Sequence, residues 1–417
     1  MPSQYDVVIV GASFSGLSLA HHLPHELRVL VVDVKPFAGA TVESTGLITV
    51  RTRAELATFV PIDRFITNSI TAICVVAPNF VDQFTSHTAV PWIFQTDTKA
   101  LVCHLADSLP ANVTFLPSTA FLEAHGMPVH EVVLRTNGSG NETVQTRFLV
   151  GADGSRSRVA ASTEGLERNG RFLFGYEQVL FGRVHLGPRP QETISHFWFG
   201  EFSLGYGGWL SPTVVDGRPA FRIGLAKLAH DRADAPALMA RFLRMLVDRG
   251  MVTMDRPNDA PYSVFGSMIP IGGVLRRTHA KNVLLIGDAA GLCGAFAADG
   301  IKGAIVSGKE AASLITRTLS GDTAALAELP ARVNAHDGLM DYYRRQVRYR
   351  FIWDRMRRNR TFAAMHAVIA AERDSFLDQF CDSKDRRHSL ARVVLKPRHA
   401  LRLARYASCL LLDVLGV

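Results

Sequence analysis

Two glycines frame the first stretch of this sequence that could do chemistry. Gly11 and Gly16 lie in DVVIVGASFSGLSLA, residues 6–20, where an apolar run precedes the turn and leucines at helical spacing follow it. A strand, a glycine turn and a helix in this order place backbone N–H groups and the positive helix end against a pyrophosphate. Ser13 stands where a further glycine would allow the closest approach, and its hydroxyl could bond a phosphate oxygen.

A carboxylate follows at the distance that a nucleotide site requires. A second strand is predicted at 27–32 and ends at Asp33, where such folds bind a ribose hydroxyl. The pattern therefore predicts a dinucleotide site. Its expected residues are Gly11, Ala12, Ser13, Phe14, Ser15, Gly16, Asp33 and Lys35.

Composition restricts the classes of protein to consider. The chain has 417 residues, of which 47% are hydrophobic, so we expect a large core and two or three domains. We find neither a leader nor an apolar run of about eighteen residues, and expect a cytoplasmic protein. The five cysteines are scattered without a CxxC pair, which predicts no disulfide framework and no metal site.

Positive charge is concentrated near the end of the sequence. The net charge is +8, and residues 331–417 hold 18 Lys and Arg against 9 Asp and Glu. Segments 342–360 and 391–417 mix arginines with apolar residues at helical spacing. We favour helices that pack on the body with solvated arginines, and keep peripheral contact with an anionic membrane as the alternative. No nucleic-acid motif is found, so no nucleic-acid partner is expected.

The elements that must position these residues follow from the apolar runs and turns. Alternating short strands dominate the middle of the chain, and two strands at 69–77 and 89–96 flank a polar turn region. A discontinuous nucleotide-binding domain is therefore interrupted by a β-rich substrate domain and followed by a helical region. The predicted bounds are 1–70, 97–168 and 275–330 for the nucleotide-binding domain, 71–96 and 169–274 for the β-rich substrate domain, and 331–417 for the helical region.

Two later motifs resemble those of a known superfamily. FLVGADGSRSRVA (148–160) and NVLLIGDAAG (282–291), with the first turn and Asp33, resemble the three fingerprints of the FAD-dependent oxidoreductases that include aromatic hydroxylases, geranylgeranyl reductases and flavin halogenases. The resemblance implies an α/β fold. It consists of a Rossmann-like, glutathione-reductase-type FAD-binding domain, an interleaved antiparallel β-sheet substrate domain and C-terminal helices.

The resemblance also implies roles for particular residues. The first turn would bind the FAD pyrophosphate, Asp33 the adenosine ribose and Asp288 the ribityl chain. Asp153 would lie between the flavin and the approach of a nicotinamide. The further cofactor-binding residues implied are Thr98, Asp153, Gly154, Gly287, Asp288, Ala298, Gly300 and Ile301.

Within the superfamily, residues 287–312 look most like the geranylgeranyl reductase group. The matching positions are Gly291, Gly300, Ile301, Ser307, Gly308, Ala311 and Ala312. Four positions depart from the superfamily pattern, and lost arginine contacts predict weaker FAD binding. They are Ala295 for proline, Ala298 for glycine, Ala160 for arginine and Thr98 for arginine.

Few other residues are expected to do chemistry. In GYGGWLSP (205–212), Tyr206 and Trp209 are the predicted substrate contacts, and the alternative is an aromatic strand that packs a sheet. Cys293 lies in the loop that the resemblance places near the flavin, and a structural role is favoured. The histidines of the first helix, at 21, 22 and 25, are expected at the surface.

Three functions remain open at this point. The leading hypothesis is NAD(P)H-driven reduction of a carbon–carbon double bond in a hydrophobic, isoprenoid-like substrate, with NAD(P)H docking transiently. The alternatives are a flavin-dependent monooxygenase acting on a hydrophobic or aromatic metabolite, and a redox-inactive flavin-fold binding protein. Consumption of oxygen separates the first two, and the third predicts no flavin reduction.

Overall fold

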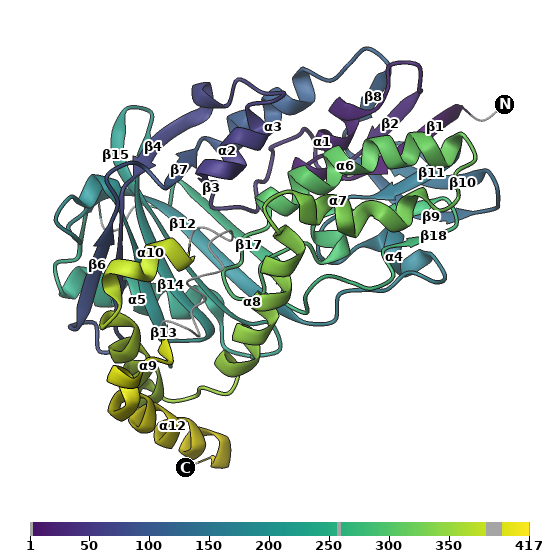
Figure 1. Cartoon of the computed structure of the whole chain (residues 1–417). Helices are drawn as coiled ribbons and strands as arrows, with labels where there is room; N and C mark the ends of the chain where they lie inside the picture. Colours follow the sequence, from purple (N-terminus) through teal and green to yellow (C-terminus); the bar gives the residue numbers. More distant parts are fainter. Residues whose placement is uncertain (1–2, 257–259, 381–393, 417) are drawn as a thin grey trace.

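The protein is described by a computed structural model over residues 3–256, 260–380 and 394–416. Figure 1 shows two sheets side by side, with helices over the first and the C-terminal helices along the second. Cys381, the segment 391–393 at the start of the second basic stretch, and Val417 lie outside the described residues. The α/β fold, with its Rossmann-like sheet, antiparallel sheet and C-terminal helices, is confirmed.

A mostly parallel sheet forms one half. Its order is β18-β19-β11-β1-β2-β8, with β10 beside β11 and β9 beside β10. Residues 7–10 are apolar and buried, as expected for a central strand that is covered on both faces. Its strands are β1 (Gln4–Val10), β2 (Val29–Val32), β8 (Val113–Leu116), β9 (Thr119–His125), β10 (His130–Thr136), β11 (Asn141–Gly151), β18 (His279–Ala280) and β19 (Val283–Leu285).

The second sheet is antiparallel except for one pair. Its order is β16-β12-β15-β14-β13-β5-β6, with β17 also paired to β12, and β13 runs parallel to β5. Helix α5 (Ala235–Asp248) packs against this sheet through Met239 and Phe242. The strands are β5 (Ala72–Val76), β6 (Gln83–His87), β12 (Phe172–Val184), β13 (Thr193–Gly200), β14 (Ser203–Val215), β15 (Arg218–Leu228), β16 (Val252–Met254) and β17 (Ser263–Pro270).

The region between residues 66 and 96 differs from the prediction. The expected strand at 69–77 is two strands, β4 (Ile66–Ile70) and β5, and β4 pairs with β7 (Ile93–Thr96) in a small sheet with β3 (Leu47–Thr49). The expected polar turn contains β6, an edge strand that buries only Phe84 and Ser86. An edge strand with one solvated face is polar at most positions, which hid it in the sequence. The domain bounds themselves stay a prediction.

Close packing between α1 (Phe14–His22) and α6 (Ile301–Leu319) joins the start of the chain to its later part. The Ser18 hydroxyl donates to the Ile305 carbonyl over 2.8 Å. A Cβ at Gly308 would lie 2.5 Å from the Ser15 carbonyl oxygen, so only glycine allows this approach. The Ser307 hydroxyl accepts the N–H of Gly287 over 3.0 Å. The Ser-Gly pair of the reductase-like motif thus performs a packing role.

The remaining helices cover the two sheets and extend along one side of the molecule (Figure 1). They are α2 (Val50–Leu56), α3 (Thr98–Asp107), α4 (Arg158–Ser162), α7 (Leu329–Ala335), α8 (Leu339–Trp353), α9 (Asn359–Ala370), α10 (Arg373–Phe380) and α12 (Ala400–Leu415). The short 3-10 helices are η1 (Ile62–Phe65), η2 (Pro190–Glu192), η3 (Gly287–Ala290), η4 (Ala325–Glu328) and η6 (Pro397–His399). No helix in the described ranges has the length and apolarity needed to cross a bilayer.

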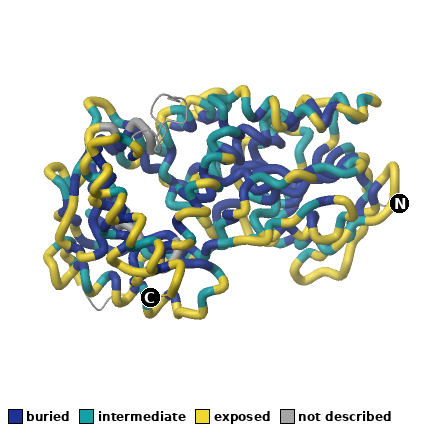
Figure 2. Tube along the Cα trace, turned by 60° about the horizontal axis from the view of Figure 1, so that its bottom comes forward, coloured by how far each residue is buried: buried dark blue, intermediate teal, exposed yellow. Residues whose placement is uncertain are grey.

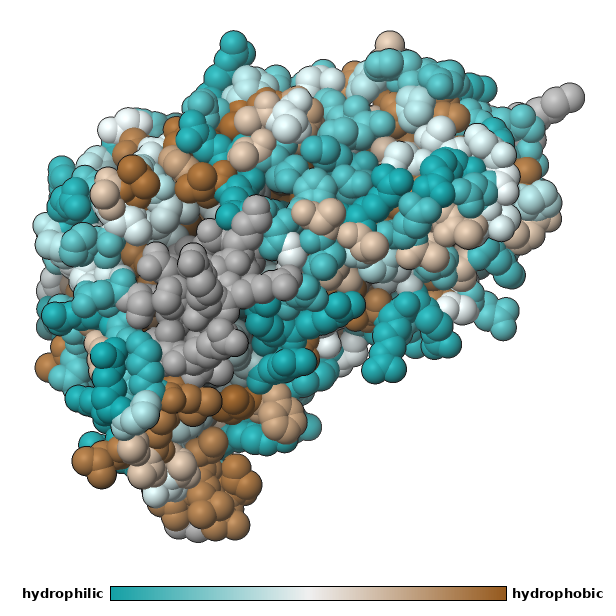
Figure 3. Space-filling model, viewed as in Figure 1, coloured by the Kyte–Doolittle hydropathy of each residue, from teal (hydrophilic) through white to brown (hydrophobic). Residues whose placement is uncertain are grey.

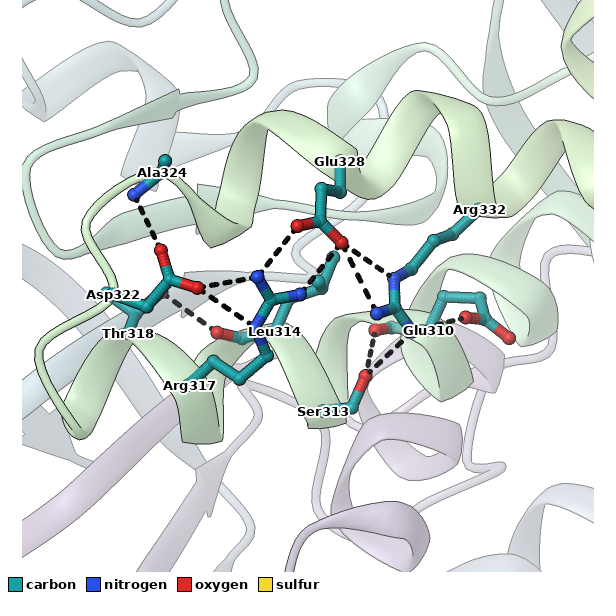
Figure 4. A network of polar contacts seen from close by, with 9 residues as sticks. All are labelled: Glu310, Ser313, Leu314, Arg317, Thr318, Asp322, Ala324, Glu328 and Arg332. Carbon is teal, nitrogen blue, oxygen red and sulfur yellow. Dashed lines mark hydrogen bonds and ion pairs between the residues drawn. The ribbon is translucent and has the colours of Figure 1, made fainter.

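Polar contacts fix α6 against the helices that follow it. Figure 4 shows Arg317 between Asp322 and Glu328, with Arg332 also reaching Glu328. Arg317 donates to Glu328 over 2.7 and 2.8 Å. Exposed pairs of this kind contribute little to stability, so the network orients α7 more than it stabilises the fold.

The buried residues form clusters inside both halves. Figure 2 shows buried segments through the interior and exposed ones around the outside, including segments near the C-terminus. One cluster unites the parallel sheet with α1, α6 and the start of α8. A second connects Tyr206 of β14 with Phe362 of α9 and Tyr406 of α12. The C-terminal helices therefore share a core with the antiparallel sheet.

Candidate functional site

A cavity of about 710 Å³ is lined by residues of both sheets. Part of its lining comes from the parallel-sheet half and α6, and includes Gly11, Ser13, Phe14, Ser15, Asp33, Lys35, Arg51, Asp153, Gly154, Asp288, Ala298, Asp299, Gly300, Ile301 and Lys302. The antiparallel sheet supplies the part that we call the sheet wall. Its residues are Ile73, Gly175, Ile194, Ser195, His196, Tyr206, Trp209, Leu210, Ser211, Phe265, Ser267, Met268 and Ile269.

The first glycine turn packs tightly even without a ligand. Gly11 has a φ of +110°, and a Cβ there would lie 2.3 Å from the Ala152 carbonyl oxygen. A Cβ at Gly16 would lie 1.9 Å from the Gly11 carbonyl oxygen. Both glycines are therefore required by the fold. Ser13, the N-cap of α1, makes no side-chain cap, so this helix presents its first N–H groups without a side-chain acceptor.

Asp33 ties the turn to the end of β2. One carboxylate oxygen accepts the N–H of Ala12 over 2.7 Å, and the other accepts the N–H of Lys35 over 2.9 Å. The ammonium group of Lys35 donates to the Thr41 carbonyl over 2.8 Å. Asp33 and Lys35 both line the cavity, so each keeps a surface toward a ligand.

Asp153, in the second fingerprint, binds the start of helix α4 through hydrogen bonds. Its carboxylate accepts the N–H groups of Arg158 over 2.6 Å and Val159 over 3.1 Å, at the start of α4. Burial raises the pKa of this carboxyl group, and the hydrogen bonds oppose that rise. Gly154, with a φ of +76°, also lines the cavity.

Asp288 presents a carboxylate to the cavity without a hydrogen bond from any described residue. The Asn169 amide donates to the main-chain carbonyl of Asp288, over 2.8 Å, and not to its carboxylate. Burial, with a smaller contribution from Glu43, raises the pKa of Asp288 to about 6. A carboxylate that lacks internal donors while facing a cavity is suited to accept hydrogen bonds from a polyol.

The N-terminus of α6 enters the same cavity. Gly300 is its N-cap and makes no side-chain cap, and Asp299 beside it accepts the Tyr342 O–H over 2.8 Å. Ala298 has a φ of +57°, a conformation that costs a non-glycine residue about 1–2 kcal/mol. A backbone suited to glycine is thus kept where the sequence has alanine.

Ion pairs behind the cavity position two of its cations. Arg51 of α2 pairs with Asp337, and Lys302 of α6 contacts the same carboxylate over 2.8 Å.

His336, next to Asp337 in the sequence, adds contacts between α2 and α6. Its ring lies between Glu55, at 2.6 Å, and Glu310, at 2.9 Å. Hydrogen bonds to these two carboxylates raise the pKa of His336.

The sheet wall carries no Asp, Glu, Lys or Arg among its described residues. Its histidine, His196, stays neutral at ordinary pH because burial lowers its pKa to about 4. The Tyr206 hydroxyl donates to the Ala297 carbonyl over 2.9 Å, and its ring meets that of Trp209 edge-on at 5.9 Å. The wall is therefore uncharged, and most of its side chains are aromatic or aliphatic.

Charge lies beneath this wall. Trp209 donates from its indole N–H to Glu177 over 2.6 Å, and Arg222 donates to the same buried carboxylate over 2.9 Å. Burial raises the pKa of Glu177, and Arg222 opposes that rise. A Cβ at Gly224 would lie 2.1 Å from the Trp209 ring. The orientation of Trp209 is consequently fixed from below.

Several predicted residues lie away from the cavity lining. Thr98 does not line the cavity: its side chain is buried, and its hydroxyl lies 3.1 Å from that of Thr96. Ala12, Gly16 and Gly287 shape the surrounding turns without lining the cavity.

Cys293 and two of the predicted surface histidines are enclosed to different degrees. Cys293 lines the cavity, and burial raises the pKa of its thiol well above the usual value, which opposes a reactive thiolate. His21 and His22 are half-buried and bond to backbone carbonyls, so they are less exposed than predicted.

Sequence reasoning missed Glu177, His196, Arg51 and Lys302. Glu177 and His196 left a signal, because each is a lone polar residue within an apolar strand, in FLFGYEQVLFGRV and TISHFWFG. Arg51 and Lys302 left none, since a single cation in the first turn of a helix is common.

Comparison with known proteins identifies this arrangement. The model of the FAD binding domain family matches residues 4–327. Digeranylgeranylglycerophospholipid reductase 2 of Methanosphaera stadtmanae is 24% identical over 310 residues, which cover 73% of this chain and 75% of that protein.

Two solved structures share the fold. A geranylgeranyl bacteriochlorophyll reductase-like protein of Thermoplasma acidophilum superposes with a TM-score of 0.73 at 17% identity, covering 88% of this chain and 92% of that one. The p-nitrophenol 4-monooxygenase of Pseudomonas putida superposes with a TM-score of 0.67 at 14% identity, covering 98% and 99%. The chain belongs to the FAD binding domain family, as an FAD-dependent oxidoreductase that is similar to geranylgeranyl reductase-like proteins.

Proposed function

We propose that the protein reduces carbon–carbon double bonds in a long apolar, isoprenoid-like substrate, with NAD(P)H as a transiently docked electron donor. The observation that carries this proposal is the uncharged sheet wall of the cavity. An anionic or strongly polar substrate would find no ionic partner on that wall, whereas a hydrocarbon chain loses nothing by leaving water there. The name of the Methanosphaera relative, a reductase of a geranylgeranyl lipid, supports the same substrate class.

The features of the cavity fit an FAD. The N-terminus of α1 would take the pyrophosphate, Asp33 the adenosine ribose and Asp288 the hydroxyls of the ribityl chain. FAD supplies two-electron hydride chemistry when bound. The chain itself orients the reactants: Ala298 and Gly300 shape the backbone beside the cavity, and Tyr206 and Trp209 contact the substrate.

Turnover under two atmospheres tests the proposal. Purified protein loaded with FAD is mixed anaerobically with NADH or NADPH, and flavin bleaching is followed by absorbance. A lipid bearing geranylgeranyl chains is then added, and we expect mass spectrometry to show added pairs of hydrogen atoms, with faster turnover when oxygen is excluded. Product that contains an oxygen atom, formed with matching oxygen consumption, would instead establish the monooxygenase. Absence of any flavin reduction would leave the redox-inactive binding protein.

A variant on the sheet wall tests where the chain binds. Ile194→Trp enlarges a half-buried side chain of the sheet wall. We expect a higher KM for the lipid, while reduction of the flavin by NAD(P)H in the absence of lipid keeps its rate. The matched control is Val264→Trp, at an exposed position of β17 outside the lining, which should change neither value. Equal lipid kinetics in the protein and in Ile194→Trp would contradict the assignment.

A further inference from the structure

Helix α12 has two faces of different character. The buried or half-buried positions that face the protein recur at helical spacing and are Leu403, Tyr406, Cys409, Leu410 and Asp413. The Asp413 carboxylate accepts the N–H groups of Arg357 and Arg358, just before α9, and so anchors the helix. The helix is therefore held by one face alone.

The opposite face is apolar and open to solvent. Leu401 is 88% exposed and Leu415 66%, with Leu411, Leu412 and Val414 also exposed between them. Figure 3 shows hydrophobic side chains gathered at the tip of the molecule where Figure 1 places α12. An exposed apolar stripe of this kind on an anchored helix marks a surface that contacts something apolar.

The exposed charged residues of α12 indicate which kind of partner this surface contacts. Arg402 and Arg405 are exposed on the same helix, and its one acidic residue, Asp413, is buried. Two copies joined through this stripe would bring four arginines together without acidic partners. An anionic lipid surface takes the leucines into its acyl region and pairs the arginines with headgroups. The helix, about 24 Å long, is too short to span a bilayer and suited to lie in its plane.

We infer that the outward face of α12 docks the protein on an anionic membrane surface. Leu401, Leu411, Leu412, Val414 and Leu415 enter the interface, and Arg402 and Arg405 contact the lipid phosphates. The inference does not depend on the reaction, since it rests on this surface alone. If the proposed function also holds, docking brings the enzyme to the phase in which an apolar lipid substrate is dissolved.

Vesicle flotation of the full-length protein tests the inference. We use phosphatidylcholine vesicles with and without about one third phosphatidylglycerol. We expect strong binding to the anionic vesicles and weaker binding to the neutral ones. The paired variant Leu411→Gln and Leu415→Gln should bind both about tenfold less or worse, because interfacial binding scales with the apolar area inserted.

The charge is tested by Arg402→Gln with Arg405→Gln. Each basic residue near an anionic surface contributes roughly fivefold, so the pair should lose roughly 25-fold on anionic vesicles and little on neutral ones. The matched control for the leucine variant is Val81→Gln with Val90→Gln, two exposed valines in a different part of the fold, which should bind as the parent does. Flavin content and thermal unfolding of every variant are compared with the parent to confirm folding.

Several outcomes would overturn the inference. They are absence of binding to anionic vesicles, equal binding by the leucine variant, or equal loss in the Val81 and Val90 control. A dimer in sedimentation experiments that dissociates in the leucine variant, without vesicle binding by the parent, would assign the surface to a second copy. These readouts use no catalysis, so failure of the proposed reaction leaves them unaffected.

Discussion

Replacing Asp288 by asparagine should stabilise the flavin-free protein and weaken its hold on FAD. The carboxylate faces the cavity without a donor from the described residues, and burial raises its pKa from 3.8 to about 6. One pKa unit corresponds to about 1.4 kcal/mol, so ionised Asp288 destabilises the fold by up to about 3 kcal/mol. Because the group is only half-buried, solvent screening makes this figure an upper bound.

The sign of the pH dependence follows from the direction of this shift. The folded protein holds the proton more tightly than the unfolded chain, so stability falls as pH rises from about 4 to about 6 and then stays low. Asp288→Asn removes this contribution. Its free energy of unfolding should match that of the parent at low pH and exceed it by up to about 3 kcal/mol at neutral pH.

Urea unfolding of flavin-free parent and variant at several pH values measures this difference. A flavin titration at neutral pH should show FAD affinity reduced by about 1.5–3 kcal/mol, the value of a charge-assisted hydrogen bond. Asp33→Asn is the matched control, since each of its two carboxylate oxygens accepts a backbone N–H group, an amide can replace only one of these acceptors, and the variant should therefore be less stable. If Asp288→Asn is less stable than the parent at neutral pH, the carboxylate has internal partners and the reasoning is wrong.

Three further predictions concern neighbouring features. Ser13→Asp supplies the missing cap of α1 and should keep or raise stability by about 1 kcal/mol. It should also weaken FAD binding about 100-fold, since like charges about 5 Å apart repel by about 3 kcal/mol. Equal FAD titrations of parent and variant would refute the assigned pyrophosphate site. Ala298→Gly should raise the free energy of unfolding by about 0.5–1 kcal/mol by relieving a positive φ, whereas Ala297→Gly should lower it, and the reverse order in urea unfolding would contradict this. His336 has a raised pKa, so its stabilisation is full below about 6.5 and is lost as pH rises through the folded value; His336→Gln should show a flatter stability profile over this range, and parallel profiles would exclude the effect.

The sequence alone predicts the elements that are periodic in themselves. The buried run of β1, the turn at Gly11 and the helix after it follow from local patterns, and the two later motifs indicate which strands complete the sheet. The polar edge strand β6 could not be found this way, because its pattern depends on its neighbour β5. Pairing across distant segments is a property of the whole fold.

The candidate site was predictable in its outline and less so in its detail. Asp33 and Asp288 line the cavity as the fingerprints suggest, but Thr98 turns away into the protein. Gly11 is a second example of missing detail. The motif indicates that Gly11 lies close to a ligand, whereas the structure shows that a Cβ there would first meet the Ala152 carbonyl. A substitution such as Gly11→Val, which the motif suggests as a test of FAD binding, would therefore disturb the fold itself.

The sheet that holds the cofactor site is assembled from the two ends of a long stretch of chain, and this sets an order of events during synthesis. β1 pairs with β11 more than a hundred residues later, and β11 with β19 later still. Helix α6 follows after β19. It packs against α1 and contributes Ile301 to the cavity. Until residue 319 has left the ribosome, the first strand and helix have no complete partner, and non-local pairing of this kind is slow and exposes apolar surface. A nascent chain that stops before α6 should thus lack part of the cofactor site, which is complete only after α6 has been made.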